Sequence, residues 1–344
     1  MKPARLLATV VGGLLLVLAC APVQAPAGPE VAAPTLHEDA LSASDGARLP
    51  MRSWLPENGP PDAVVIALHG FNDYSNFFDG TGRFLAGRGI ASYAYDQRGF
   101  GASPNRGLWP GSDALADDLR SAIAAVRVRH AGTPLYLFGE SMGGAVVMTL
   151  MADARPPAVD GVILAAPAVW GRSSMPWYQT TALWMAVHTV PGSRVTGGGL
   201  GIQASDNTEM LKSLGRDPMV IKGTRIDAVW GLVNLMDQAM AAAAALQGRL
   251  LILYGERDQL IPPGALAEML ARLPRDGTGQ RRFALYADGW HMLIRDLQAE
   301  TVWRDIDAWI ADPAAPLPSG ADGHGATRAC PSRAVCAVDA FPPL

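Results

Sequence analysis

Six short apolar runs, spaced along the chain, constrain its fold more than any other feature of the sequence. Each run is apolar on both of its alternating faces, and most of them end in or next to a glycine. This pattern is typical of parallel strands that are buried on both sides, rather than of half-exposed antiparallel strands. The runs lie at 63–70, 90–99, 134–139, 161–168, 249–255 and 281–289.

Amphipathic helical segments separate these runs and complete the prediction of the fold class. The segments 113–130, 264–274 and 301–312 each place their apolar residues on one helical stripe. Buried strands that alternate with helices predict an α/β fold, with a mostly parallel central sheet covered by helices on both faces. Residues 41–56 precede this pattern and predict two short strands around a turn at Asp45 and Gly46.

One long interval, about 169–247, contains no clear strand and is rich in Trp, Met and Leu. We interpret it as a helical cap inserted between two strands of an α/β domain that spans 39–312. The chain has 344 residues, of which 49% are hydrophobic, and this is enough to bury a large core.

The N-terminus has the layout of a secretory signal. Residues 1–20 begin with basic side chains, continue with an apolar stretch that is short for a membrane span, and end in "VLAC". This ending resembles the lipobox of bacterial lipoproteins, which implies that Cys20 is lipidated and anchors the protein to a membrane surface without spanning it. Ala21 after the cysteine then favours the outer membrane, facing the periplasm or the cell surface. The alternative is an ordinary cleaved signal with an incidental cysteine.

Both flanks of the domain have a composition that predicts irregular structure. Residues 21–38 are rich in Pro and Ala and predict a flexible tether, and residues 313–344 lack periodic apolar positions. This tail holds Cys330 and Cys336, whose spacing is compatible with a disulfide or with two free thiols. The net charge of −4, with no basic run, excludes nucleic acid as an expected partner.

The pentapeptide "GESMG" at 139–143 is the strongest candidate for a catalytic motif. It follows a predicted buried strand and precedes an apolar helix, and active groups of parallel sheets lie at the carboxyl ends of strands. A sharp strand-to-helix turn strains the serine backbone and needs glycine where neighbouring chain segments come close. We therefore predict that Ser141 is a nucleophile whose hydroxyl projects above the sheet.

A serine nucleophile needs a base and an orienting acid. Among the six histidines, His291 follows the last predicted strand, on a loop at the carboxyl edge of the sheet. Asp258 lies just after the penultimate strand, and the order serine, aspartate, histidine is the order of α/β-hydrolases. Glu256 and Asp288 are the rival candidates for the acid.

The loop after the first long strand, "HGFND", should supply part of an oxyanion hole. We expect the backbone amides of Phe71 and Met142 to bind the oxyanion. His69 is then expected to hold the shape of the loop, and Arg98, in the loop after the next strand, to pair with nearby carboxylates.

The motifs "HGFNDYSNFF", "YDQRGFGAS", "GESMGG", "YGERDQLIP" and "GWHML" together resemble the monoacylglycerol lipase and lysophospholipase group of α/β-hydrolases, also described as serine aminopeptidase-like. The resemblance covers roughly 41–310. It implies a helical cap over the site, and it implies Ser141 as nucleophile, Asp258 as acid and His291 as base. The cap carries no motif that matches residue by residue.

These predictions combine into an acyl-transfer enzyme that needs neither a metal nor an organic cofactor. We expect a serine hydrolase that cleaves monoacylglycerols, lysophospholipids or similar esters, with the apolar cap residues facing the acyl chain and the anchor holding the enzyme at a membrane. Two alternatives stay open. One is an aminopeptidase of the same fold, and the other is a non-catalytic envelope lipoprotein that binds lipid.

Overall fold

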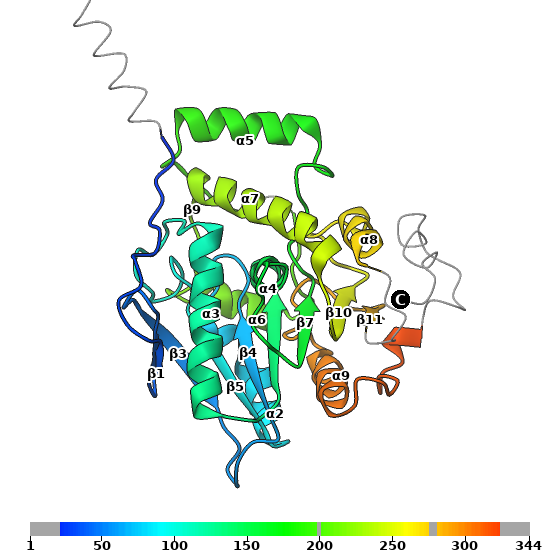
Figure 1. Ribbon diagram of the computed structural model, residues 1–344. Helices are drawn as coiled ribbons and strands as arrows, with labels where there is room; N and C mark the ends of the chain where they lie inside the picture. The colour runs from blue at the N-terminus through cyan, green and yellow to red at the C-terminus, as the bar shows by residue number, and fades with distance from the viewer. Residues whose placement is uncertain (1–20, 198–200, 275–280, 324–344) are drawn as a thin grey trace, which may run out of the picture.

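A nine-stranded, mostly parallel sheet forms the centre of the protein. The computed structural model describes residues 21–197, 201–274 and 281–323 (Figure 1). The strand order is β1-β2-β3-β5-β4-β6-β7-β10-β11, and every pairing from β5 to β11 is parallel. The three strands at the other edge pair antiparallel. The predicted fold class is therefore confirmed. The strands of this sheet are β1 (Thr35–Leu36), β2 (Ala40–Ser42), β3 (Arg48–Trp54), β4 (Ala63–Leu68), β5 (Ile90–Tyr95), β6 (Leu135–Glu140), β7 (Gly161–Ala165), β10 (Leu250–Gly255) and β11 (Arg281–Tyr286).

Helices cover both faces of the sheet because its central strands are apolar on both faces. In β4 every residue is buried, and alternate residues belong to two separate hydrophobic cores. Val64, Ile66 and Leu68 face the core shared with α3, α4, α7 (Ile226–Ala242) and α8, whereas Val65 and Ala67 face the core shared with α2 and α9. The helices outside the cap are η1 (Ser75–Phe78), α2 (Asp79–Ala86), α3 (Ser112–Arg129), α4 (Met142–Met151), α8 (Pro263–Arg272), α9 (Ala299–Ala311) and η3 (Ala321–Gly323).

The segment between β7 and β10 is mostly helical and lies over one end of the domain (Figure 1). Helix α7 packs on the sheet side, where nine of its residues are buried. Helix α5 lies on the outside of α7, and Val187 is its only buried residue. The predicted cap range, 169–247, lies within this segment. Its elements are α5 (Trp177–Thr189), β8 (Arg194–Val195), α6 (Thr208–Arg216), β9 (Thr224–Arg225), α7 (Ile226–Ala242) and η2 (Ala243–Ala245).

The segment 21–38, for which the composition predicts a tether, runs along the surface of the domain. Gln24 forms a parallel bridge with Trp109, and the Gly28 amide donates to the Asp45 carboxylate at 3.0 Å. The Val23 amide donates to Asp227, at the start of the cap helix α7, at 3.1 Å. The N-terminal segment is thus hydrogen-bonded to both the main domain and the cap.

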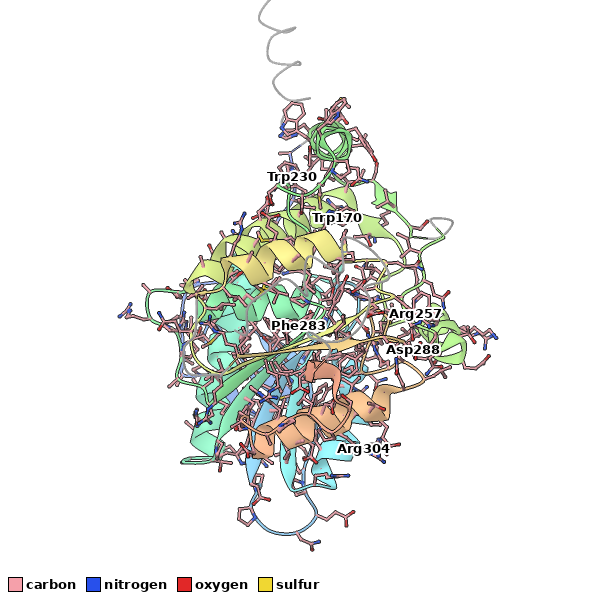
Figure 2. The ribbon with its side chains drawn as sticks, turned by 90° about the vertical axis from the view of Figure 1, so that its right-hand side faces the viewer. Trp170, Trp230, Arg257, Phe283, Asp288 and Arg304 are labelled. Carbon is pink, nitrogen blue, oxygen red and sulfur yellow. The ribbon has the colours of Figure 1, made fainter. Side chains whose placement is uncertain are left out.

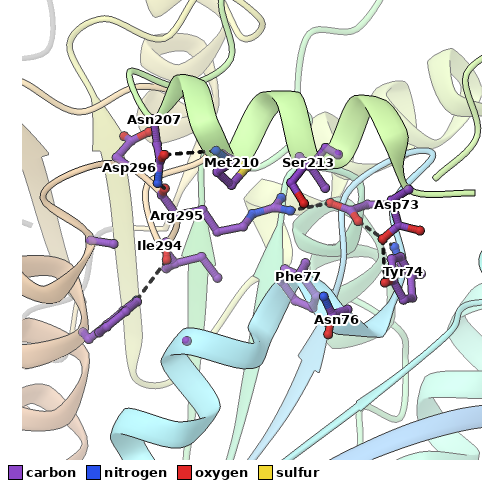
Figure 3. A pocket seen from close by; sticks show the side chains of 15 residues that line it. Asp73, Tyr74, Asn76, Phe77, Asn207, Met210, Ser213, Ile294, Arg295 and Asp296 are labelled. Carbon is purple, nitrogen blue, oxygen red and sulfur yellow. Dashed lines mark hydrogen bonds and ion pairs between the residues drawn. The ribbon is translucent and has the colours of Figure 1, made fainter. Parts of the chain in front are cut away.

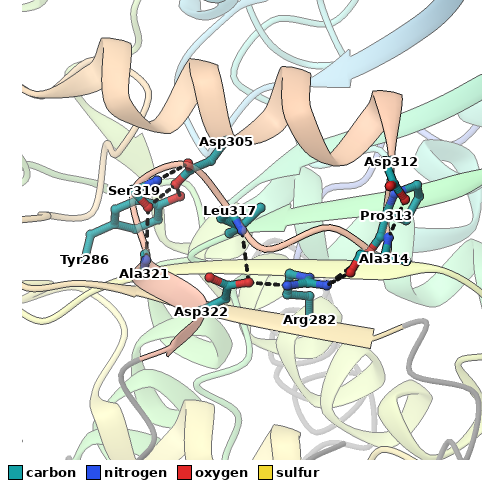
Figure 4. A network of polar contacts seen from close by, with 10 residues as sticks. All are labelled: Arg282, Tyr286, Asp305, Asp312, Pro313, Ala314, Leu317, Ser319, Ala321 and Asp322. Atoms are coloured by element: carbon teal, nitrogen blue, oxygen red, sulfur yellow. Dashed lines mark hydrogen bonds and ion pairs between the residues drawn. The ribbon is translucent and has the colours of Figure 1, made fainter. Parts of the chain in front are cut away.

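The first part of the tail, 313–323, runs back between α9 and β11 (Figure 4). Asp305 of α9 accepts hydrogen bonds from the Tyr286 hydroxyl at 2.8 Å and from the Ser319 amide at 3.0 Å. Arg282 of β11 pairs with Asp322, and Leu317 is buried. We call residues 313–323 the C-terminal strap. Cys20, Cys330 and Cys336 lie outside the described residues.

None of the helices within the described ranges combines the length and the apolar character that crossing a membrane would require.

Candidate active site

Ser141 occupies a strained turn between the central strand β6 and helix α4. Its backbone has φ 53° and ψ −114°, a region that residues with a side chain rarely adopt. The turn needs its flanking glycines. A Cβ atom on Gly139 would lie 2.6 Å from the Gly144 backbone, and a Cβ atom on Gly143 would lie 2.3 Å from the Leu68 carbonyl oxygen. The sequence therefore folds here into the sharp turn expected for a nucleophile.

His291 and Asp258 meet at the same edge of the sheet. The His291 Nδ1 lies 2.8 Å from Asp258 Oδ2, and both side chains are buried. The other carboxylate oxygen of Asp258 accepts from the amides of Leu260 and Ile261, at 2.7 and 3.0 Å. These two amides hold the carboxylate so that its free oxygen faces the imidazole.

The electrostatics of this pair favour a charged imidazole. Burial by itself would lower the pKa of His291, but the neighbouring Asp258 carboxylate outweighs it and raises the pKa above the usual value of 6.5. The carboxylate also requires the proton of a neutral imidazole to sit on Nδ1. Nε2 is then left as the basic nitrogen.

The two rival candidates for the acid, Asp288 and Glu256, are not hydrogen-bonded to His291 in the described structure. Asp288 is exposed and pairs with Arg257 at the surface, where Figure 2 shows the two side chains together. Glu256 follows the end of β10 and is half-buried; the structure records a backbone hydrogen bond from its amide to the Tyr286 carbonyl at 3.0 Å. Of the three carboxylates, Asp258 is the one hydrogen-bonded to His291.

The loop after β4 lies against the serine. A Cβ atom on Gly70 would come within 3.4 Å of the Ser141 Cβ. Within the described ranges, the backbone amides of Phe71 and Met142 donate to no acceptor. Two unpaired N–H groups beside a nucleophile, one of them at the positive end of the α4 dipole, are suited to binding a developing oxyanion.

His69 is fully buried and holds this loop. Its Nε2 accepts from the Gln97 amide at 3.0 Å, so its Nδ1 carries the proton and donates to the Gly70 carbonyl at 2.8 Å. Burial lowers the pKa of His69, which keeps the ring neutral. Both ring nitrogens are thus hydrogen-bonded within the fold, which agrees with the expectation that His69 holds the shape of the loop. Arg98 likewise pairs with Asp118 and Asp45, at 2.7 and 2.9 Å.

One charged cluster beside the candidate triad was not predicted. Arg295, four residues after His291, donates to Asp73 and to Glu140, each at 2.7 Å. Glu140 is the residue before Ser141, and Asp73 lies two residues after Phe71. The available signal was the charge of Glu140 at the end of a strand whose other residues are apolar or glycine, because such a charge needs a buried partner.

Arg295 also lines a cavity of about 300 Å³ between α6, η1 and the start of α9 (Figure 3). Asp73 and Phe77 lie on one wall, and Asn207 and Met210 of the cap on another. The cavity adjoins the Arg295 side of the site; neither Ser141 nor His291 is among its lining residues.

Residues 59–298 match the family described as "Serine aminopeptidase, S33". This match covers more than two thirds of the chain and contains Ser141, Asp258 and His291. The chain belongs to this family. It is an α/β-hydrolase, and the resemblance predicted from its motifs is confirmed.

Members with curated names are similar over most of the chain. The monoacylglycerol lipase of Mycolicibacterium smegmatis is 24% identical over 279 residues, which are 80% of this chain and 97% of that protein. The human monoglyceride lipase is 25% identical and covers 78% of this chain and 88% of its own length.

Solved structures share the fold of this S33-family chain. A soluble variant of the Saccharomyces cerevisiae monoglyceride lipase superposes with a TM-score of 0.66 at 20% identity, and covers 85% of this chain and 99% of its own. The Paleococcus ferrophilus monoacylglycerol lipase superposes with a TM-score of 0.63 at 22% identity, and covers 76% of this chain and 98% of its own.

Proposed function

We propose that this protein is a serine hydrolase that cleaves carboxylic esters of lipids, of the monoacylglycerol or lysophospholipid type. The observation that carries the proposal is the 2.8 Å hydrogen bond between His291 and Asp258, at the sheet edge where Ser141 occupies its strained turn. The named relatives are monoacylglycerol lipases, which favours esters over peptides as substrates.

The reaction proceeds in two acyl-transfer steps. His291 Nε2 takes the proton of the Ser141 hydroxyl as its oxygen attacks the ester carbonyl carbon. Asp258 stabilises the resulting imidazolium, and the Phe71 and Met142 amides bind the oxyanion, each such donor contributing about 3 kcal/mol. His291 returns the proton to the leaving alcohol. Water, deprotonated by the same imidazole, then releases the acid from Ser141.

The apolar surroundings of the site support an acyl chain as part of the substrate. The Phe71 ring packs against Phe100 and Trp109, with centroids 5.6 and 6.4 Å away, and Met142 is fully buried. The cap adds partly buried apolar side chains, including Trp170, which Figure 2 places on the cap side of the molecule.

The test is turnover by the purified protein on monoacylglycerols, lysophospholipids and aminoacyl amides, with Ser141→Ala as the control. We expect ester hydrolysis by the wild type, a loss of at least about 10⁴-fold in the variant, and fluorophosphonate labelling of the wild type alone. Preferred cleavage of aminoacyl amides would favour the peptidase alternative. Absence of both turnover and labelling would favour a non-catalytic lipid-binding protein.

The choice of Asp258 as the acid has a matched control in Asp288. Asp258→Asn keeps the shape of the side chain but removes the charge that fixes the tautomer of His291, and we expect kcat to fall about 10⁴-fold. Asp288→Asn removes only a surface ion pair and should leave kcat within about twofold. Equal losses in the two variants would contradict the assignment.

We also propose that the protein is a lipoprotein of the bacterial outer membrane, anchored through Cys20 and facing the periplasm or the cell surface. The described chain starts beside one end of α5 (Figure 1). Helix α5 exposes the side chains of Trp177, Tyr178, Trp184 and Met185. Aromatic side chains of this kind favour the interface between a membrane and water.

Palmitate labelling of the expressed protein tests this location. Wild-type protein should be labelled and Cys20→Ala should not, whereas equal labelling of both would exclude the anchor. A version that starts at Ala21 should still bind vesicles of phosphatidylethanolamine and phosphatidylglycerol, and Trp177→Ser/Trp184→Ser should weaken this binding. Unchanged binding by the double variant would exclude α5 as the contact.

A further inference from the structure

Three segments far apart in the sequence converge on the guanidinium of Arg295. Its Nη1 donates to Asp73 at 2.7 Å, and its Nη2 donates to Glu140 at 2.7 Å. Asp73 belongs to the loop after β4, Glu140 ends β6, and Arg295 follows the loop of His291. Each of these segments also carries one candidate group of the active site: the Phe71 amide, the Ser141 hydroxyl and the His291 imidazole.

The cluster is buried, which makes its ion pairs sensitive to geometry. The side chain of Arg295 is 12% exposed, and those of Asp73 and Glu140 are 7% and 2% exposed. Buried charges need well-aligned partners, because desolvation otherwise outweighs their attraction. The planar guanidinium of an arginine holds two carboxylates in fixed directions, whereas the three donors of a lysine ammonium rotate about one bond and fix no such directions.

Other contacts help to hold Asp73 and Arg295 in place. The Tyr74 amide donates to Asp73 at 2.9 Å, and the guanidinium lies 5.9 Å from the centroid of the Phe77 ring. The Arg295 carbonyl accepts from Asn207 of the cap at 3.1 Å, and Figure 3 shows the arginine extended from this side toward Asp73. Arg295 is therefore held at both ends, through its backbone carbonyl and through its guanidinium group.

We propose that Arg295 is a positioning residue, whose fork joins Asp73 and Glu140 and thereby sets the distances between the oxyanion loop, the nucleophile turn and the base. The inference rests on the proposed function. Small displacements between a nucleophile and its base reduce catalysis strongly, whereas they affect substrate binding in the cap less.

The decisive variants are Arg295→Met and Arg295→Lys, assayed with a p-nitrophenyl ester. We expect kcat to fall about a hundredfold in the first and at least about tenfold in the second, with KM changed less than about threefold in both. The rate of Ser141 labelling by a fluorophosphonate should fall in parallel, because it needs the same alignment without turnover.

Arg98→Met provides the matched control. Arg98 is likewise an arginine that pairs with two carboxylates inside the fold, Asp45 and Asp118, neither of which belongs to a candidate catalytic loop. We expect Arg98→Met to lower the unfolding temperature about as much as Arg295→Met does, but to leave kcat within about threefold of the wild-type value. If Arg295→Met does not fold, Asp73→Asn, which keeps the shape of one arm and removes its charge, should lower kcat about tenfold without changing KM.

The outcomes separate the inference from the proposed function. If the wild type is active and Arg295→Met, Arg295→Lys or Asp73→Asn keeps full activity, the positioning role of Arg295 is overturned and the proposed function stands. Equal losses of kcat in Arg295→Met and Arg98→Met would also overturn it, because they would show a general effect of lost stability. A wild type that neither hydrolyses esters nor reacts with the fluorophosphonate would overturn the proposed function, and the inference with it.

Discussion

In the proposed mechanism the chemistry depends on Ser141, Asp258 and His291, and the immediate surroundings of each side chain determine its conformation or its protonation. Ser141 is held at a positive φ by the close approach of backbone on both sides. Asp258 is fixed by two backbone amides. His291 is buried against that carboxylate, so its protonation depends on the balance between desolvation and attraction.

This balance predicts the pH dependence of the reaction. His291 must be neutral to accept the serine proton, and its pKa is raised above 6.5 because Asp258 outweighs the effect of burial, with Glu140 adding to the attraction and Arg295 opposing it. Activity should therefore decline as the pH falls, and the half-maximum should lie above pH 6.5. The measurement is kcat/KM from pH 5 to 9, which reports the free enzyme. A half-maximum of kcat/KM below pH 6.5 would contradict the raised pKa of His291.

At the scale of elements, the turn from β6 to α4 shows why glycine is required at particular places. Helix α4 starts directly after Ser141 and packs so closely on the neighbouring strand β4 that Gly143 has no room for a side chain. The same closeness lets the Met142 amide and the loop after β4 face one site. The close packing of α4 on β4 therefore also determines the geometry of the candidate site.

Gly143→Ala should destabilise the protein by about 3 kcal/mol, because its Cβ would lie 2.3 Å from the Leu68 carbonyl oxygen. Gly264→Ala is the control. Gly264 lies in helix α8 with nothing within 4 Å of an added Cβ, so the change should stabilise by about 0.5 kcal/mol. Urea unfolding of both variants measures the difference. Equal stabilities would show that the turn can relax.

At the scale of the whole molecule, segments from both ends of the chain pack onto the domain. Residues 21–38 are hydrogen-bonded to the domain and to the first turn of α7. The C-terminal strap contacts both β11 and α9, through the Arg282–Asp322 ion pair and the hydrogen bond from the Ser319 amide to Asp305, and the side chain of Leu317 is buried. The packed part of the chain therefore extends past the predicted limits of the domain, 39–312.

Deletion of residues 313–344 should lower the unfolding temperature by about 5 °C, because Asp305 loses Ser319, Arg282 loses Asp322, and the apolar surface that Leu317 covers is exposed. Deletion of 324–344 keeps the strap contacts and should leave the unfolding temperature unchanged within about 1 °C. Calorimetry of the two truncated proteins makes the comparison. A similar decrease of the unfolding temperature in both truncated proteins would show that the strap is not the stabilising part of the tail.

The sequence by itself determined the parallel sheet, the helical insertion and the positions of Ser141 and His291, because buried strands and strand-end motifs are local patterns. The sequence favoured Asp258 over Glu256 and Asp288 as the candidate acid because of its position just after the penultimate strand, and in the structure Asp258 is the one of the three that is hydrogen-bonded to His291. The path of residues 21–38 and the strap depended on partners that composition does not encode. The tertiary structure alone brought Asp73, Glu140 and Arg295 together, because a buried ion pair is a property of segments 67 to 222 residues apart that meet only in the fold.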